Sequence, residues 1–341
     1  MNTSPDTLPS ETALIRGGSA AARTEKHPLL TRLTSGSGGA LLGLIVLFAV
    51  FSVTTPRFFS APNLINVVDQ VTVLGVLAIG ATAVIITGGI DLSVGSVLAL
   101  STMVLGWLSH DGGVSMPIAM IAAVLVGALA GLLNGLGVTI IGLPPFIATL
   151  AMMSVCRGLA NLLTDGQQIV GYPEWFYQLA STRYLGFFSV TAIIFVLLAV
   201  AAAVLLKYRA AGRKVYAVGG SAEVARLAGV KVRAVTTWVY VTAGALAGVG
   251  AIILASRLDS SQPSAGTGYE LDVIAAVVIG GASLSGGTGR ISGTVIGVLI
   301  IGVLRNGLNL LGVSPFIQQI VIGLVIAGAV GVDMLRRRRT R

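Results

Sequence analysis

The stretch VDQVTVLGVLAIGATAVIITGGIDLSVGS, residues 68–96, decides what kind of protein this is. Its first part, 68–87, is apolar and has the length of about 20 residues that a helix needs to cross a bilayer. Gly88 and Gly89 follow, and then a single carboxylate, Asp91. Because irregular backbone inside a membrane is tolerated only where it faces protein or water, this break is a candidate functional segment.

The composition of the whole chain agrees with a membrane protein. Of its 341 residues, 55% are hydrophobic and only 10% are charged, and the mean hydropathy is +0.92. Soluble domains carry about 25% charged residues, so a water-soluble fold is excluded. The 45 glycines favour close packing between helices. A single cysteine, Cys156, rules out an internal disulfide.

Apolar runs long enough for membrane spans recur along the chain. We expect an all-α polytopic membrane protein with about ten transmembrane helices, at 39–55, 68–87, 92–109, 116–134, 146–163, 186–206, 235–255, 271–284, 291–310 and 315–333. The eighth of these runs is short, so it either crosses fully or is a half-helix or re-entrant segment. We expect three parts: a disordered cytoplasmic tail at 1–38, a membrane domain at 39–333 and a basic cytoplasmic tail at 334–341.

Lys and Arg residues are distributed unevenly around these spans. If the N-terminus is inside, the inner segments hold four basic residues before the first span, seven in 207–233, Arg290, and five after residue 335, together 17 of the 22. Cytoplasmic loops carry this excess in membrane proteins, so both termini are expected in the cytoplasm. The same clustering favours membrane topology over nucleic-acid binding as the reason for the net charge of +9. Arg157 and Arg305 fall within spans, where we expect them to extend toward the outer surface.

Three short motifs occur twice in the same order. They are GIDLSV (89–94) and GYELDV (268–273), NGL (134–136) and NGL (306–308), and GLPPFI (142–147) and GVSPFI (312–317). Each second copy comes five spans later, so it must point the opposite way through the membrane. This predicts a 5+5 inverted repeat, as in many transporters, with a solute pathway at the interface of the repeats. A fourth pair, GGIDLSVG (88–95) and GGASLSGG (280–287), does not fit this register.

Polar residues near the repeated motifs are the candidates for that pathway. They are Asp91, Ser93, Asn134, Glu270, Asn306 and Gln318. The two carboxylates occupy equivalent positions at the start of a span, where they either cap a helix or contact solute. The amide side chains either line the pathway or hydrogen-bond between helices.

The loop 207–234 is basic and contains a predicted helix, unlike the apolar sequence around it. Ser221 is a good N-cap, Glu223 falls in the first turn and Gly229 can end the helix. The chain has no nucleotide-binding glycine-lysine loop, no metal-ligand cluster and no catalytic constellation, which disfavours a membrane-embedded enzyme. Because ionisable residues lie only toward span ends, coupling to an ion gradient is also disfavoured. The loop is then either a handle for an external ATPase or a basic anchor with an incidental helical turn.

Three segments resemble one family of transport proteins. TGGIDLSVGS (87–96), AVGGSAEVARLAGV (217–230) and ELDVIAAVVIGGASLSGGTG (270–289) are similar to permease subunits of bacterial ABC sugar importers of the ribose type. The resemblance covers roughly residues 40–335. It implies that the coupling segment is Ser221, Ala222, Glu223, Val224, Ala225, Arg226, Leu227, Ala228 and Gly229, with Ser221 where the family commonly has Asn. We expect its small and apolar residues Ala222, Val224, Ala225 and Ala228 to dock into a groove of the ATPase.

The resemblance also implies a function and partners. The chain is expected to be a multi-pass permease in a bacterial inner membrane, translocating a monosaccharide by alternating access without a cofactor of its own. Its expected partners are a second permease subunit, a cytoplasmic ATPase, an extracytoplasmic solute-binding protein and membrane lipid, with no nucleic acid. The alternative is a gradient-driven secondary carrier of a small polar solute. Uptake that survives without any ATPase would favour the carrier.

Overall fold

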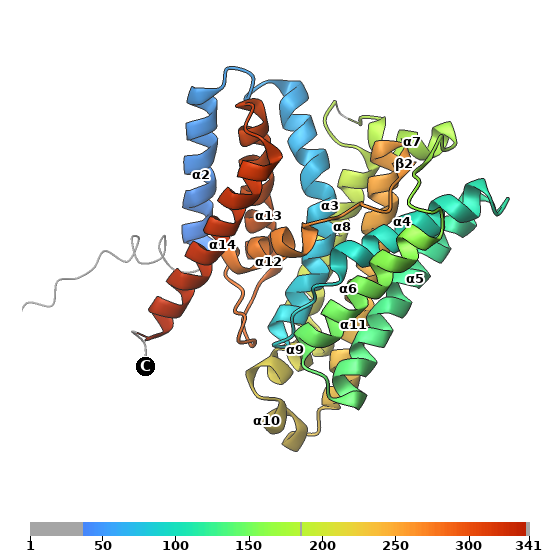
Figure 1. Ribbon diagram of the computed structural model, residues 1–341. Coiled ribbons are helices and arrows are strands. Elements are labelled where there is room, and N and C mark those ends of the chain that lie inside the picture. The colour runs from blue at the N-terminus through green and yellow to red at the C-terminus, as the bar shows by residue number, and fades with distance from the viewer. Residues whose placement is uncertain (1–36, 185, 339–341) are drawn as a thin grey trace, which may run out of the picture.

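The computed structural model describes residues 37–184 and 186–338, which are predominantly helical (Figure 1). In chain order the helices are α2 (Ser37–Thr54), α3 (Ala61–Ile86), α4 (Val94–His110), α5 (Met116–Leu136) with the π-helix η1 (Gly137–Ile141), α6 (Pro145–Leu162), α7 (Glu174–Ser181), α8 (Val190–Tyr208), α9 (Ala210–Gly220), α10 (Ala222–Leu227), α11 (Val232–Leu258), α12 (Tyr269–Ile279), α13 (Ile291–Leu310) and α14 (Pro315–Arg338). Two short strands, β1 (Ile169–Val170) and β2 (Ser260–Ser261), pair antiparallel. Most of the expected N-terminal tail lies outside the described residues, and α14 continues into the expected basic tail.

Within the described part of the chain, six helices are long and apolar enough to cross a membrane: Ala61–Ile86, Met116–Ile141, Pro145–Leu162, Val190–Tyr208, Val232–Leu258 and Ile291–Leu310. Three shorter apolar helices are Gly38–Thr54, Val94–His110 and Pro315–Gly328. The expected span at 271–284 is instead the 11-residue helix α12. At 1.5 Å per residue α12 is about 16 Å long, half the thickness of a bilayer core. Of the two alternatives for this segment, its length fits the half-helix, because the glycines after residue 279 continue the apolar composition without continuing the helix.

The helices form one elongated bundle (Figure 1). The helices α2, α13 and α14 stand together at one end, and α5 forms the opposite edge. Between them α12 lies crosswise to its neighbours, in front of α3. The pair α9 and α10 projects from one face of the bundle, and α7 with the two short strands lies at the opposite face.

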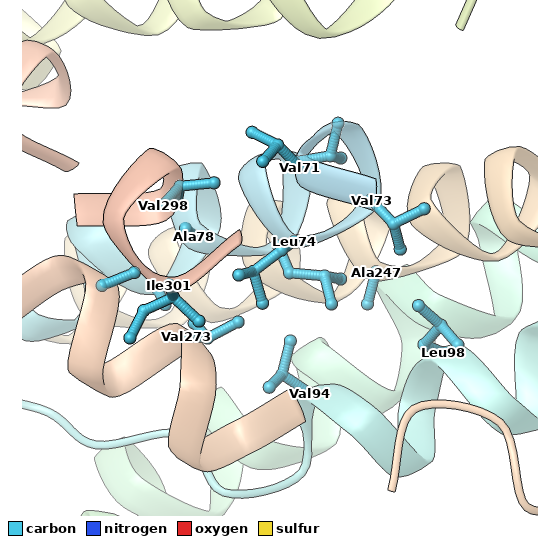
Figure 2. Close-up of a cluster of buried hydrophobic side chains, with 14 of the residues drawn as sticks. Val71, Val73, Leu74, Ala78, Val94, Leu98, Ala247, Val273, Val298 and Ile301 are labelled. Atoms are coloured by element: carbon cyan, nitrogen blue, oxygen red, sulfur yellow. The ribbon is translucent and has the colours of Figure 1, made fainter. Parts of the chain in front are cut away.

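The centre of the bundle is α3. In an apolar 18-residue stretch of α3, 83% of the residues are buried, whereas the corresponding share in α8 is 22%. The helix α3 is therefore surrounded by protein, and α8 is not. Figure 2 shows apolar side chains from α3, α4, α11, α12 and α13 gathered in one cluster. The labelled members are Val71, Val73, Leu74, Ala78, Val94, Leu98, Ala247, Val273, Val298 and Ile301.

The closest helix pair is α5 and α11, and it is built on glycine. Gly127, Gly131 and Gly135 recur every four residues on α5, and they therefore lie on one face of that helix. A methyl group at Gly127 would overlap the carbonyl oxygen of Gly244, and one at Gly131 would overlap that of Tyr240. Small residues let two backbones approach, which is how membrane helices gain packing contacts when lipid is as apolar as their side chains.

Contacts in the two halves of the chain follow a parallel scheme. In the first half α4 packs against α5 and α6, and both α4 and α5 pack against α11. In the second half α12 packs against α13 and α14, and both α12 and α13 pack against α3. The two long buried helices, α3 and α11, also contact each other.

Candidate functional site

The break between α3 and α4 is organised by one carboxylate. Oδ1 of Asp91 accepts hydrogen bonds from the backbone N–H of Ser93 at 2.8 Å and from the Ser93 hydroxyl at 2.6 Å. Asn134, from α5, donates its side-chain N–H to the same hydroxyl at 2.9 Å. All three side chains are buried, with at most 7% exposed. Asp91 therefore closes the turn that precedes α4 and does not itself cap the helix, because the N-cap residue is Ser93.

A residue of α6 holds the other side of this break. The Thr149 hydroxyl accepts from the backbone N–H of Leu92 at 3.1 Å and donates to the carbonyl oxygen of Ile90 at 3.2 Å. Thr149 is fully buried. Backbone groups of the irregular segment 88–93 are thus satisfied by Asp91 and by Thr149 of α6, as a chain inside a membrane requires. Sequence reasoning did not find Thr149, because a single Thr in an apolar run has no distinguishing pattern.

Two buried polar atoms beside the break have no hydrogen-bond partner among the described residues. They are Oδ1 of Asn134 and the hydroxyl of Tyr240 on α11. A methyl group at Gly89 would overlap the Tyr240 hydroxyl, so this hydroxyl lies directly against the break. An unpaired buried polar group costs about 1–3 kcal/mol, so its retention in an apolar core needs a reason.

The start of α12 approaches α4 one turn after the break. Glu270 is half-buried, and a methyl group at Gly95 would meet its carboxylate. Two residues on, Asp272 forms an ion pair with Arg305 of α13 at 2.6 Å. Arg157 of α6 donates to the backbone carbonyl of Ala265 at 3.0 Å. Arg157 and Arg305 are both partly exposed, and each also has a partner in the protein: backbone carbonyl groups for Arg157 and a carboxylate for Arg305.

Two further candidates lie elsewhere. Asn306 of α13 exchanges side-chain hydrogen bonds with Asn63 of α3, at 3.0 and 2.9 Å. Gln318 donates to Asn309 at 2.7 Å and to the carbonyl oxygen of Val313 at 2.9 Å, which closes the turn before α14. Both side chains are at most 6% exposed. The structure therefore brings Asp91, Ser93 and Asn134 together, with Glu270 near α4, and it separates them from the other two.

The predicted helix in the loop 207–234 is confirmed as α10. The Ser221 hydroxyl accepts from the backbone N–H of Val224 at 3.3 Å, and Gly229 follows the helix with a φ of +80°. One expectation about its surface is wrong: Ala225 is only 3% exposed, because it packs against its own chain. Val224 and Leu227 are instead 64% and 79% exposed. Together with Ala222 and Ala228, which are also exposed, these two form the apolar surface of α10.

A second helix in this loop, α9, was not expected. Tyr216 donates its hydroxyl to the carbonyl oxygen of Gly289 at 2.8 Å. Burial raises the pKa of this hydroxyl, so it remains protonated and able to donate at neutral pH. A methyl group at Gly219 would overlap the carbonyl oxygen of Ile86, the last residue of α3. The helix α9 therefore contacts both the end of α3 and the loop 280–290.

The loop 280–290 and the break before α4 lie side by side. The backbone N–H of Gly287 donates to the carbonyl oxygen of Ile86 at 2.8 Å, and a methyl group at Gly286 would meet the backbone of Gly88. These are the two look-alike segments 88–95 and 280–287 that the repeat register did not explain. Their shared glycines have a local reason, because both backbones must approach each other and α9.

We predict that the two carboxylates near α4 respond differently to substitution. Asp91→Ala removes two buried hydrogen bonds, so the purified protein should lose thermal stability, by roughly 1–3 kcal/mol. Glu270→Ala should change stability little, because Glu270 accepts no hydrogen bond from the described residues. Thermal unfolding of both variants in the same detergent checks this. An equal loss in the two variants would contradict the assignment of Asp91 as the structural carboxylate.

Comparisons with known proteins place the chain in a family. Residues 63–330 match the family described as branched-chain amino acid transport system / permease component. The chain is 48% identical to the ribose import permease protein of Bacillus subtilis over 296 residues, covering 86% of this chain and 92% of that one.

Two relatives from Escherichia coli are also similar. The ribose import permease protein is 44% identical over 304 residues, with 86% and 92% of the two chains covered. The D-allose transport system permease protein is 35% identical over 313 residues, with 92% and 96% covered. No solved structure was found to match the chain. The long apolar helices, the hydrogen-bonded break and this similarity agree, and the chain belongs to the family of transport-system permease components.

Proposed function

We propose that this protein is the membrane-spanning subunit of an ATP-driven, binding-protein-dependent importer of a monosaccharide, located in a bacterial inner membrane. The family description names amino acids, whereas the relatives above are named for ribose and D-allose and match most of the chain. The relatives named for these sugars are 48% and 35% identical to this chain, which supports a sugar as the solute. We propose a pentose or a related monosaccharide as the solute.

The position of α9 is the observation that best supports an ATP-driven mechanism. An ATPase that docks on α10 acts on the membrane domain through the segments that α10 contacts, and α9 is one of them. It contacts the end of α3, directly before the break, and the loop between α12 and α13. A displacement of α10 would therefore reach the inner ends of both halves of the chain at once.

We propose that this displacement switches the subunit between outward-open and inward-open states. The break at 88–93 is irregular backbone held by three side chains, so it can change conformation at less cost than a helix. The unpaired Tyr240 hydroxyl and Asn134 carbonyl beside it are groups that a second conformation can satisfy. A ligand or partner shifts such an equilibrium only by binding the two states with different affinity. We assign that role to the ATPase.

Coupling to an ion gradient is less consistent with the charges inside the bundle. Asp272 is paired with Arg305, and Asp69 with Arg183 at 2.5 Å. Asp91 is hydrogen-bonded to its own turn. Proton- or sodium-coupled carriers need ionisable groups that gain and lose a partner during transport. Glu270 is partly exposed and accepts no hydrogen bond from the described residues, and we propose it as the pathway residue.

We further propose a ten-segment topology with both termini in the cytoplasm. The parallel contact schemes of α4–α6 around α11 and of α12–α14 around α3 support a 5+5 inverted repeat. In this scheme α4 and α12 correspond, which matches GIDLSV with GYELDV. The half-helix α12 and the loop 280–290 together complete one crossing. The face with α7 is then extracytoplasmic and available to a solute-binding protein.

A second permease subunit is proposed to cover the face that carries α6 and α14. These two helices correspond in the repeat and flank α12 on the same face of the bundle (Figure 1). They expose large apolar side chains, including Phe146 and Leu150 on α6 and Phe316 and Ile320 on α14. Glu270 starts the helix between them, so a pathway between two copies would pass it.

We expect labelling from opposite sides of the membrane for α7 and α10. Single cysteines at Gln178 and Glu223, each in a Cys156→Ser background, are placed at exposed positions. A membrane-impermeant maleimide should label Gln178→Cys in intact cells and Glu223→Cys only after permeabilisation. Labelling of both in intact cells would contradict the topology.

The function and the coupling segment are tested together by ribose uptake into vesicles that contain the permease, its ATPase and its binding protein. Uptake should require ATP, and Leu227→Glu should reduce uptake and ATPase co-purification at least tenfold, since it puts an unpaired carboxylate into an apolar contact. Arg226→Ala is the matched control and should have a mild effect. Wild-type ATPase binding by Leu227→Glu would exclude α10 as the docking surface, and ribose uptake without ATP would exclude the ATP-driven mechanism.

A further inference from the structure

A cavity of about 790 Å³ lies beside α9 on the face that carries α10. Its lining comes from the end of α8, from α9, from the loop 280–290 and from the first turn of α13. The lining includes the cations Lys207, Arg213 and Arg290 and no Asp or Glu. Three cations from three different segments thus line one open cavity.

One residue of α8 orients two of these cations. Nζ of Lys207 lies 5.0 Å from the centre of the Tyr208 ring. Nη1 of Arg213 donates to the carbonyl oxygen of Tyr208 at 3.3 Å. Neither cation forms an ion pair in the described part of the chain, and the same is true of Arg290. The cavity therefore has a charge of +3 without a protein counter-charge.

The first turn of α13 adds to the positive potential of this cavity. Arg290 is the N-cap residue, and no side chain caps the helix. The first helical hydrogen bond runs from Thr294 to the carbonyl oxygen of Arg290, so the preceding backbone N–H groups have no helical acceptor. The preferred N-cap residues are Ser, Thr, Asp and Asn, and the positive end of the helix dipole favours a negative charge. A cation at this position has the unfavourable sign.

We propose that this cavity binds a phosphate-bearing anion. A phosphate group would accept hydrogen bonds from the uncapped N–H groups of α13 and from Ser292, and it would neutralise the three cations. The phosphate can belong to an anionic phospholipid of the cytoplasmic leaflet or to a soluble phosphate compound. Basic pockets between helices on the cytoplasmic side are suited to anionic headgroups.

The bound anion would also connect two parts of the subunit. Arg213 belongs to α9, and Arg290 starts α13. An anion between them would reinforce the Tyr216–Gly289 hydrogen bond that joins the same two segments. Its presence would therefore strengthen the contact through which α9 reaches the second half of the chain.

The test is the thermal stability of the full purified chain in detergent, measured with added inorganic phosphate and, separately, with phosphatidylglycerol or phosphatidylcholine. Stabilisation by phosphatidylglycerol alone identifies a lipid headgroup, and stabilisation by inorganic phosphate as well identifies a site open to soluble anions. Arg290→Gln should weaken the response at least fivefold. Lys231→Gln removes a cation of the same face outside the cavity, and it should leave the response unchanged.

A third variant separates binding from misfolding. Arg290→Asp supplies a carboxylate at the N-cap of α13, so it should raise the unfolding temperature in anion-free buffer and abolish the response to phosphate and phosphatidylglycerol. If neither anion stabilises the wild type, the proposal is overturned. That result is expected if an acidic surface of the ATPase fills the cavity instead. An equal loss in Arg290→Gln and Lys231→Gln would show diffuse surface charge and would also overturn it.

Discussion

Three backbone segments meet at the carbonyl oxygen of Ile86: the end of α3, the helix α9 and the loop 280–290. Gly287 donates its N–H to this oxygen, and Gly219 lies so close that any side chain would overlap it. A direct contact between backbone atoms transmits a displacement without the loss that rotation about the bonds of a long side chain allows. The helix α9, the end of α3 and the loop before α13 are therefore joined by direct backbone contact, and the proposed coupling segment α10 follows α9 in the chain.

Several of the polar contacts inside the bundle lie where the helices are interrupted. Asp91, Ser93 and Asn134 satisfy the break before α4, and Arg157 binds carbonyl groups of the segment before α12. In lipid an unsatisfied backbone group costs several kcal/mol, so an interruption persists only with such partners. The interruptions are also the places where the backbone can rearrange. The same residues therefore stabilise the fold at the places where, in the proposed mechanism, the backbone moves.

Composition and local chemistry were enough to predict much of this structure. Apolar runs located most of the helices, and Ser221 and Gly229 located the ends of α10 because capping is a property of neighbouring residues. Contacts between distant positions could not be predicted. The pair Asn63 and Asn306 is separated by 243 residues. The burial of Ala225 depends on tertiary packing, and the length of α12 depends on glycines whose composition is as apolar as the helix itself. Tyr240 could not be singled out from the sequence, because what distinguishes it is a buried hydroxyl without a hydrogen-bond partner among the described residues.

The measurement that tests this account most directly compares Gly219→Val with Gly220→Val in vesicles that contain the ATPase and the binding protein. Gly220 has open space around it and serves as the matched control. We predict that Gly219→Val still binds the ATPase and supports ATP hydrolysis but loses at least nine-tenths of ribose uptake, whereas Gly220→Val remains close to wild type. Uptake by Gly219→Val at the wild-type rate, with normal expression, would contradict transmission through this contact.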